Sequence, residues 1–387
     1  MKGDESDSKP IKNKGNKPAV PQPLETAIVV RDLSVAAYKI PTDAPEADGT
    51  LQWKSTTLVL VEIKAGGKAG IGYTYAQEAT AFFIQSKLKA LVEGKNALDI
   101  EGITTFLIKQ IRNSGTTGIA MMAVSAIDNA LWDLKAKLLA VPLCKLLGQV
   151  SNSMLLYGSG GFTSYSKKQL QQQFAAWAEE GIRYMKMKVG AQPEKDVQRV
   201  QDARDVLGSD VKLMIDANGA YTAKQALQIA QEVLPFNVVW FEEPVSSDNL
   251  PGLCFIRERA PAHINIAAGE YGYNLPYFEA MLAANAVDVL QADATRCGGI
   301  SGFLKAGHLC EAHQLPFSSH CAPALHLHAA VALPNFFISE YFHDHVRIEQ
   351  LLFDGVSPPQ NGVLKPDLSR PGFGLEFKRK DAAKYKR

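Results

Sequence analysis

The chain has 387 residues, of which 46% are hydrophobic, enough for a large folded core. Its 41 basic and 40 acidic residues leave a net charge of +1, so no basic or acidic surplus points to nucleic acid or to a membrane surface. No stretch approaches the roughly 18 to 20 apolar residues of a transmembrane helix. The five widely spaced cysteines predict reduced thiols in a cytoplasmic protein rather than a disulfide framework.

Residues 1–24 differ from the rest of the chain. Lys, Pro, Asn, Asp and Ser dominate them, and they lack the apolar core of a secretory signal. We predict a disordered N-terminal extension, because so little apolar surface cannot offset the entropy lost on ordering.

The next part of the chain predicts strands followed by helices. Thr26–Val35 and Thr57–Ile63 are typical of strands, and helical periodicity follows in three segments: Ala76–Leu91, Ile103–Arg112 and Met121–Leu139. Between the strands, the Pro, Gly and acidic residues of Pro41–Thr50 indicate a loop, and so long a loop is uncommon without a role. Its acidic residues would suit a cationic or polyhydroxylated substrate: Asp43, Glu46 and Asp48.

From Tyr184 onward, strand-like apolar runs alternate with helical segments. The runs end, in chain order, at Lys188, Asp216, Glu242, Glu270, Asp293, His320 and Glu340, in steps of 20 to 28 residues. Helical periodicity fills most intervals and the segment before the first run: Gln169–Glu180, Glu194–Leu207, Ala223–Leu234, Leu275–Ala284 and Ile300–Gln314. This spacing predicts parallel βα units.

A closed (β/α) barrel explains the polar strand ends better than an open doubly wound sheet. A barrel gathers the C-terminal ends of its strands around one mouth, whereas an open sheet would scatter them. No Gly-X-Gly-X-X-Gly follows the early strands, which removes the main support for a dinucleotide fold. The chain is long enough for a barrel of about 250 residues and a smaller domain.

Strand alternation directs Lys186 and Lys188 to one face of the run Tyr184–Val189. Repulsion and desolvation both disfavour two charged ammonium groups in one small space. We therefore expect at least one of them to act as a neutral base, with a pKa of roughly 7 to 8. The alternative for an isolated Lys-X-Lys is an exposed strand with two solvated lysines.

Three acids at successive strand ends predict a metal site: Asp216, Glu242 and Glu270. Hard oxygen ligands suit Mg²⁺, and the absence of Cys or His from the trio argues against zinc. His320 follows Asp293 by one βα unit, so we expect a dyad in which the carboxylate orients the imidazole as a general base.

Together these groups predict proton abstraction next to a carboxylate. A carboxylate chelated to Mg²⁺ makes its α-carbon more acidic, because the metal stabilises the second negative charge of the enediolate. Lys186 would hold the carboxylate, a protonated Glu340 would donate to the enediolate oxygen, and Asn218 would contact an α-hydroxyl. The alternatives are a salt bridge for Glu340 and a turn residue for Asn218.

The ordered motifs resemble the enolase superfamily and, within it, the mandelate racemase subgroup. They are Lys186-Met-Lys188, Asp216-Ala-Asn218, Glu242-Glu-Pro244, Gly269-Glu270, Gln291-Ala-Asp293, Ser318-Ser-His320 and Glu340. Ala126–Lys137, with Val141-Pro142 and Leu146–Gly148, is similar to the family's helix that leads into the barrel.

The resemblance implies a modified TIM (β/α)7β barrel with an α+β N-terminal capping domain. The expected boundaries are 25–145 for the cap with a substrate lid at about 40–56, 146–350 for the barrel, and 351–387 for a segment returning to the cap. It also implies the metal ligands Asp216, Glu242 and Glu270, the bases Lys188 and His320, the dyad partner Asp293, the electrophile Glu340, and Lys186 on the carboxylate. A small-molecule carboxylate substrate and a homo-oligomer are implied as well.

The reaction is less determined than its intermediate. The resemblance favours a lyase of carbohydrate acid catabolism that dehydrates an aldonate or aldarate to a 2-keto-3-deoxy acid. Two bases on opposite faces equally permit a racemase or epimerase of a 2-hydroxy or amino acid. A noncatalytic metal-binding relative would have lost a base, and a barrel enzyme of phosphorylated substrates would place glycines after its last strands; Gly298-Gly299 lies one unit too early.

Overall fold

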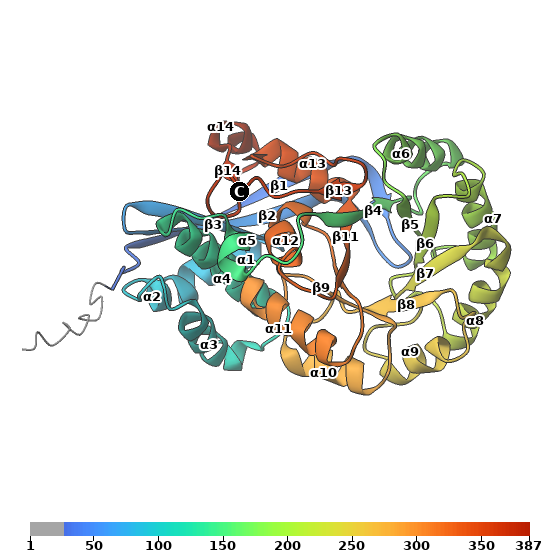
Figure 1. Cartoon of the computed structure of the whole chain (residues 1–387), viewed down its shortest axis with the longest axis horizontal. Helices are drawn as coiled ribbons and strands as arrows, with labels where there is room; N and C mark the ends of the chain where they lie inside the picture. The colour runs from blue at the N-terminus through green and yellow to red at the C-terminus, as the bar shows by residue number, and fades with distance from the viewer. Residues whose placement is uncertain (1–26) are drawn as a thin grey trace, which may run out of the picture.

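A computed structural model describes residues 27–387, so the predicted extension at 1–24 lies outside the described residues. The described chain forms a closed barrel of parallel strands beside an antiparallel sheet with its own helices (Figure 1). The barrel strands are β4 (Met154–Gly160), β5 (Tyr184–Lys188), β6 (Lys212–Asp216), β7 (Val238–Glu242), β8 (Asn265–Ala268), β9 (Val289–Ala292), β10 (Phe317–Ser319) and β11 (Phe336–Phe342). Pairing of β11 with β4 closes the ring, which confirms the predicted (β/α)7β barrel.

Helices join the successive barrel strands: α6 (Lys167–Glu179), α7 (Pro193–Arg204), α8 (Ala223–Glu232), α9 (Leu250–Arg257), α10 (Leu275–Ala283), α11 (Gly299–Ala312) and α12 (Pro323–Ala330). Five of them were expected from periodicity, whereas α9 and α12 were not. Helix α9 is only eight residues long, too short to repeat its apolar spacing, and every residue of α12 is buried, so α12 has no polar face.

The barrel interior has an apolar layer beneath a polar one. Tyr157, Met214, Trp240 and Ile338 pack together inside the ring. Because side chains of a strand alternate between faces, the residues two positions further along also point inward, at the carboxyl end of each strand. Those positions are occupied by Ser159, Asp216, Glu242 and Glu340. The apolar layer closes the bottom of the barrel, and the polar layer forms its mouth.

The cap is a three-stranded antiparallel sheet with helices against it. Its strands are β1 (Asp32–Ala47), β2 (Gln52–Ala65) and β3 (Lys68–Tyr75), and its helices are α1 (Glu78–Phe83) with the π-turn Ile84–Leu88, α2 (Lys89–Val92), α3 (Ile100–Gln110) and α4 (Ile119–Leu138). Gly72 of β3 lets α4 approach closely, since a Cβ there would lie 2.3 Å from the backbone nitrogen of Ala130. α5 (Leu143–Leu147) leads from the cap into the barrel.

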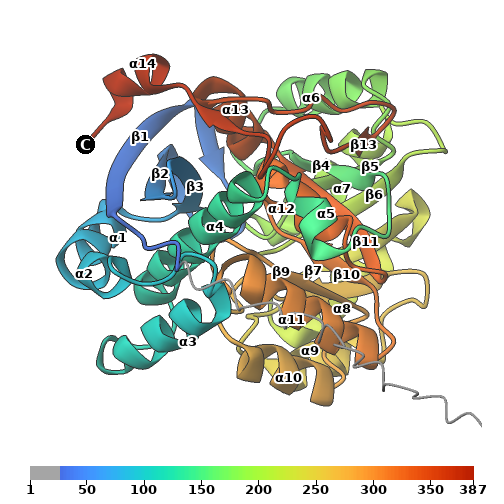
Figure 2. The same ribbon diagram turned by 60° about the vertical axis from the view of Figure 1, so that its left-hand side comes forward.

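The last part of the chain contacts both bodies. It contains α13 (His343–Leu352), β12 (Phe353–Asp354), β13 (Val363–Leu364), β14 (Glu376–Phe377) and α14 (Arg379–Ala382). β13 pairs with β4 of the barrel, whereas the amide of Arg387 donates to the carbonyl of Ala37 in β1 at 2.9 Å. Figure 2 shows α14 beside β1 of the cap. None of the helices in residues 27–387 has the length and apolar character needed to cross a membrane.

The prediction of a loop at Pro41–Thr50 is wrong. The segment is the tip of a hairpin: β1 continues to Ala47 and pairs with β2, with a register shift between Pro41 and Glu46. Proline is tolerated there because β1 is an edge strand, and because the register shift interrupts the regular backbone N–H donors of the ladder. The turn is tight, since Asp48 accepts from the amides of Thr50 at 2.6 Å and Leu51 at 2.7 Å.

This hairpin reaches across to the barrel (Figure 1). The amide of Thr163, after β4, donates to the carbonyl of Ala47 at 2.8 Å. Its hydroxyl donates to the carbonyl of Asp48 at 2.7 Å, and Arg347 of α13 donates to the carbonyl of Pro41 at 2.6 Å. The hairpin is therefore held to the barrel from two sides.

Glu46 is a fully buried carboxyl group near the tip of this hairpin. Trp53 donates to its Oε2 at 2.7 Å, while its Oε1 is buried without a partner. Burial, with the nearby carboxylates of Asp344 and Asp43, raises the pKa of Glu46 to about 8. The folded hairpin therefore favours a neutral Glu46.

We predict that Glu46→Gln stabilises the protein at alkaline pH. Because the folded-state pKa lies above the ordinary value of 4.5, the stability contributed by protonated Glu46 is fully present below about pH 4.5 and is lost as the pH rises through about 8. Melting temperatures measured from pH 5 to 9 should show the variant gaining on the wild type across that range. Glu179→Gln, an exposed control on α6, should show no such trend. If the melting temperatures of Glu46→Gln and the wild type differed by the same amount at every pH, the raised pKa of Glu46 would be contradicted.

Candidate active site

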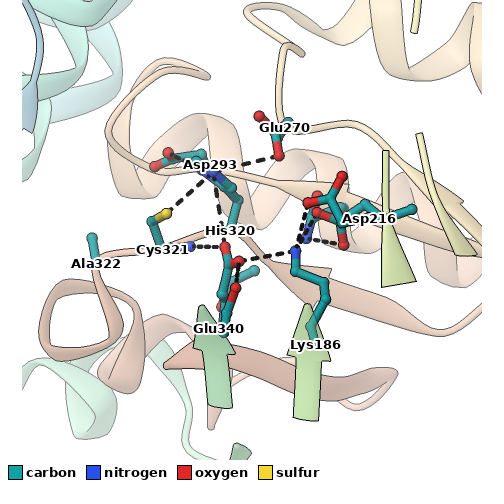
Figure 3. A network of polar contacts seen from close by, with 12 residues as sticks. Lys186, Asp216, Glu270, Asp293, His320, Cys321, Ala322 and Glu340 are labelled. Atoms are coloured by element: carbon teal, nitrogen blue, oxygen red, sulfur yellow. Dashed lines mark hydrogen bonds and ion pairs between the residues drawn. The ribbon is translucent and has the colours of Figure 1, made fainter. Parts of the chain in front are cut away.

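The barrel mouth gathers a polar side chain from the end of every strand. The structure brings together the predicted residues Lys186, Lys188, Asp216, Glu242, Glu270, Asp293, His320 and Glu340, all of them buried (Figure 3). They come from successive strands or the residues just after them, β5 to β11. β4 adds Ser159, which the sequence did not single out.

Asp216, Glu242 and Glu270 form the predicted acidic trio. One carboxylate oxygen from each lies within 4.8 Å of the others. Oε2 of Glu270 is buried with no hydrogen-bond partner, an arrangement that is costly unless something binds it. Three convergent carboxylates with one free oxygen fit a hard divalent cation such as Mg²⁺.

Charge balance at the mouth agrees with that fit. Besides the trio, Glu340 and Asp293 bring two more carboxylates. They are faced by the ammonium groups of Lys186 and Lys188 and by the guanidinium of Arg296, which lies 3.7 Å from Glu270 and 3.6 Å from Asp293. The surplus of negative charge has a visible consequence: burial and the neighbouring carboxylates together raise the pKa of Glu242 well above its usual range, although Lys186 opposes this. A divalent cation would neutralise the surplus.

The two lysines point inward from β5, as predicted. Nζ of Lys188 lies 2.5 Å from Asp216, and Nζ of Lys186 lies 2.9 Å from Glu340, 3.2 Å from Asp216 and in contact with Glu242. The prediction of a lysine pKa near 7 to 8 is wrong for this arrangement. Burial lowers both pKa values, but the carboxylates raise them more, so both lie above the usual value. The attraction of the carboxylates for the two ammonium groups outweighs the repulsion between those groups.

His320 and Asp293 form the predicted dyad. Nδ1 of His320 lies 2.8 Å from Oδ2 of Asp293, whose Oδ1 accepts from the amide of Thr295 at 2.6 Å. Burial raises the pKa of Asp293, but the hydrogen bond from His320 and the charge of Arg296 lower it by more. The pKa of Asp293 therefore lies below its usual range. The ionised carboxylate fixes the proton on Nδ1 and leaves the lone pair of Nε2 at the mouth.

Glu340 is an acceptor in this structure rather than the proton donor that was predicted. Its Oε1 accepts from Ser159 at 2.6 Å, and its Oε2 accepts from the amide of Cys321 at 2.8 Å. Burial raises its pKa, but the ammonium group of Lys186 lowers it more, so the pKa lies well below its usual range. These donors keep Glu340 ionised.

Asn218 lies at the edge of the mouth. Its backbone has φ +46° and its amide donates to Asp216 at 2.9 Å, which is the turn role considered for it. Its side-chain Oδ1 is nevertheless buried without a partner, and the residue lines the cavity. Asn218 therefore combines a turn conformation with a free acceptor.

A cavity of about 550 Å³ connects the mouth with the cap. The barrel contributes Lys188, Asn218, Glu270, Arg296 and His320 to its wall. The cap contributes Lys39, Asp48, Trp53, Ser55, Thr56, Thr57 and Gln77. Tyr75, Ala76, Gly118, Ile119 and Met122 of the cap line it as well, so the cap wall combines groups that hydrogen-bond with an apolar part.

Several residues of the site were missed by sequence reasoning. Ser159 lies in β4, whose apolar start Met154–Tyr157 gives way to small residues and ends without a charged group. Arg296, 3.6 Å from Asp293, lies in a loop. Glu243 is buried with φ +37°, and its Oε1 has no partner. Its position next to Glu242 in Glu242-Glu-Pro244 was the available signal.

Two family models cover most of the chain. Residues 32–148 match the N-terminal domain of the mandelate racemase / muconate lactonizing enzyme family, and residues 169–382 match the enolase C-terminal domain-like family. The boundary between them falls between α5 and α6, where the cap gives way to the barrel.

Individual proteins agree with the family models. A crystal structure of a mandelate racemase/muconate lactonizing enzyme-like protein from Rubrobacter xylanophilus is 50% identical, with a TM-score of 0.91, and the match covers 93% of this chain and 100% of that one. L-talarate/galactarate dehydratase from Salmonella typhimurium is 34% identical over 284 residues, 72% of this chain and 71% of the relative. A crystal structure of that dehydratase with Mg and L-lyxarohydroxamate gives a TM-score of 0.86 at 28% identity, with 97% of each chain covered. A 3,6-anhydro-alpha-L-galactonate cycloisomerase from Streptomyces coelicolor is 32% identical over 88% of this chain and 96% of its own length.

We predict that Asp216→Asn weakens Mg²⁺ binding by at least about tenfold, because a neutral amide replaces a carboxylate of the trio. Isothermal titration of EDTA-treated protein measures the effect. Asp248→Asn makes the same change at an exposed position after β7 and should leave the affinity unchanged. Equal affinities for wild type and Asp216→Asn would exclude the trio as the metal site.

Proposed function

This chain belongs to the enolase superfamily, in its mandelate racemase subgroup, and we propose that it uses Mg²⁺ to remove a proton next to a substrate carboxylate and then dehydrates an acid sugar. The product would be a 2-keto-3-deoxy acid formed from an aldonate or aldarate. The proposal makes the protein a hydro-lyase with a small-molecule substrate.

One observation carries the proposal: two groups that can transfer protons lie on either side of the acidic trio. Lys188 comes from β5, before the trio in the ring, and His320 follows β10, after it. Both line the same cavity. A substrate carboxylate placed at the trio would have one of these groups near each face of its α-carbon.

The residues have separable tasks in this proposal. When bound, Mg²⁺ would neutralise the substrate carboxylate and the second charge that develops on it as the α-proton leaves. Lys186 supplies a fixed positive charge beside the same position. One of Lys188 and His320 takes the α-proton, and the other gives a proton to the β-hydroxyl, which leaves as water. Asp293 holds His320 in the tautomer that this transfer requires.

The cavity wall supports a polyhydroxylated substrate. Serine, threonine, glutamine and lysine residues of the cap line the cavity beside the apolar Ile119 and Met122, and Asn218 leaves an acceptor free. A dehydratase named for talarate and galactarate is among the relatives. The hairpin tip at Asp48 also lines this wall, which supports its proposed role as a lid that selects the substrate.

Racemisation or epimerisation is the second candidate. It is favoured by the same pair of proton-transfer groups, since one can remove a proton and the other return it to the opposite face. A noncatalytic relative is a weaker candidate, because both groups and the trio are present.

The proposal also includes the cellular location and the oligomeric state of the protein. All five cysteines are free thiols, which supports a reducing, cytoplasmic location. Assembly into a homo-oligomer is supported by the family alone.

The deciding experiment incubates the protein with Mg²⁺ in D₂O against a panel of aldonates, aldarates and 2-hydroxy acids. Semicarbazide detects 2-keto acids, and NMR detects deuterium at the α-carbon. Keto acid from one or a few sugar acids is the expected result. Deuteration or inversion without keto acid would establish the racemase or epimerase instead, and no reaction with Mg²⁺ bound would contradict both.

We predict that Lys188→Ala and His320→Asn each reduce turnover by about 100-fold or more, because each removes one proton-transfer group. Proton exchange should separate them: Lys188→Ala should lose exchange of an S-type α-proton, and His320→Asn should lose exchange on the opposite face. NMR of substrate in D₂O measures both. Lys224→Ala and His308→Asn, at exposed positions, are the controls. Exchange retained by Lys188→Ala would remove Lys188 as a base.

A further inference from the structure

A second set of metal-ligand atoms lies beside the acidic trio, and the proposed function does not use it as such. His320, Cys321 and Glu340 each offer one ligand atom, and these atoms lie within 4.8 Å of one another (Figure 3). All three residues are buried. Unlike the trio, this set contains an imidazole and a thiol.

Its distances suit a tetrahedral ion. Sγ of Cys321 lies 3.1 Å from Nε2 of His320, and Oε2 of Glu340 lies 3.8 Å from the same nitrogen. For Zn²⁺ bonded to sulfur, nitrogen and oxygen at standard lengths, tetrahedral geometry separates the ligand atoms by about 3.4 to 3.6 Å. These two distances lie on either side of that range, each within a few tenths of an ångström of it, and the thiol and the carboxylate lie within 4.8 Å of each other.

The imidazole is oriented with Nε2 toward the thiol. Asp293 accepts the proton of Nδ1 at 2.8 Å, which leaves the lone pair on Nε2, the atom that faces Cys321. A carboxylate behind a histidine in this way orients the ring and makes the free nitrogen a better ligand. Asp293 is itself held by the amide of Thr295.

The other two ligands are positioned by the backbone. Cys321 has φ +52°, a conformation that is uncommon for residues other than glycine. In that conformation its amide donates to Oε2 of Glu340 at 2.8 Å while its thiol reaches the ring of His320. Ser159 and Lys186 hold the second oxygen of Glu340, so Oε2 remains on the side of the thiol.

We propose that His320, Cys321 and Glu340 form an inhibitory site for Zn²⁺ or a similar thiophilic divalent cation. Binding converts the thiol to a thiolate and releases its proton, and the lone pair of Nε2 becomes a metal bond. His320 and Cys321 both line the cavity, so the fourth position is open to water or to a substrate oxygen. Mg²⁺ does not compete, because it prefers oxygen ligands.

The site and its effect are separate claims. Binding depends only on the three residues, whereas inhibition rests on the proposed function, because it acts by removing His320 from proton transfer. The first measurement must therefore not depend on turnover.

Co²⁺ is the probe for binding, because a thiolate bonded to Co²⁺ gives a charge-transfer absorption band in the near ultraviolet and carboxylates do not. The full-length protein, saturated with Mg²⁺, is titrated with Co²⁺, and Zn²⁺ is then added. The expected result is a band that saturates at one equivalent and is removed by Zn²⁺. No band in the wild type would overturn the proposal.

Variants identify the thiol. Cys321→Ser should abolish the band, and Cys254→Ser is the matched control, because Cys254 is more exposed and has a carboxylate of Glu258 3.8 Å from its sulfur. A band that persists in Cys321→Ser, or that disappears in Cys254→Ser, would overturn the proposal. Far-ultraviolet circular dichroism verifies folding; should Cys321→Ser fail to fold, His320→Asn must lose the band in its place.

Turnover then tests inhibition. With a substrate identified, Zn²⁺ should inhibit the wild type reversibly, with recovery on chelation, and its inhibition constant should be at least about tenfold weaker in Cys321→Ser. Equal inhibition of both proteins would overturn the inhibitory role. A cobalt band in a protein that turns over no substrate would support the site while counting against the proposed function, so the two failures are distinguishable.

Discussion

Uncompensated negative charge at a buried barrel mouth is the constraint on which this structure depends. Asp216, Glu242, Glu270 and Glu340 converge on two ammonium groups, and Arg296 is shared between Glu270 and Asp293; all four carboxylates are almost fully removed from water. Charges cannot be buried in this way unless they are paired or bind a cation. The ion pairs of Lys186 and Lys188, the raised pKa of Glu242 and the unpartnered oxygen of Glu270 all follow from that surplus.

The barrel makes such a mouth possible by separating two layers within one ring of strands. The apolar layer around Trp240 and Met214 provides the burial that stabilises the ring, so the layer above it is free to be polar. The cap then covers this polar layer. Its hairpin is fastened by backbone hydrogen bonds to the loop after β4 and to α13, and the neutral state of Glu46 favours this closed contact.

Much of the fold was predictable because it repeats. Strand ends such as Asp216, Glu242 and Glu270 recur at nearly constant spacing, and five barrel helices show an apolar stripe. Prediction failed where the pattern is absent: β4 ends in small residues, α9 is short, and α12 is buried on all sides. It also failed at Pro41–Thr50, where composition indicates a loop but pairing with β2 on one side and docking on the barrel hold the segment extended.

The sequence by itself determined which chemical groups surround the mouth and in what order, because strand period and the βα repeat are local properties. It also determined that the trio consists of oxygen ligands and that His320 has an acidic partner. Only the tertiary structure decided the state of those groups. The ion pair of Lys188 with Asp216, the contact of Lys186 with Glu340 and the approach of Cys321 to His320 depend on distances that the folded chain sets. Those distances set the local field and hydrogen bonds, and no pattern along the chain encodes them.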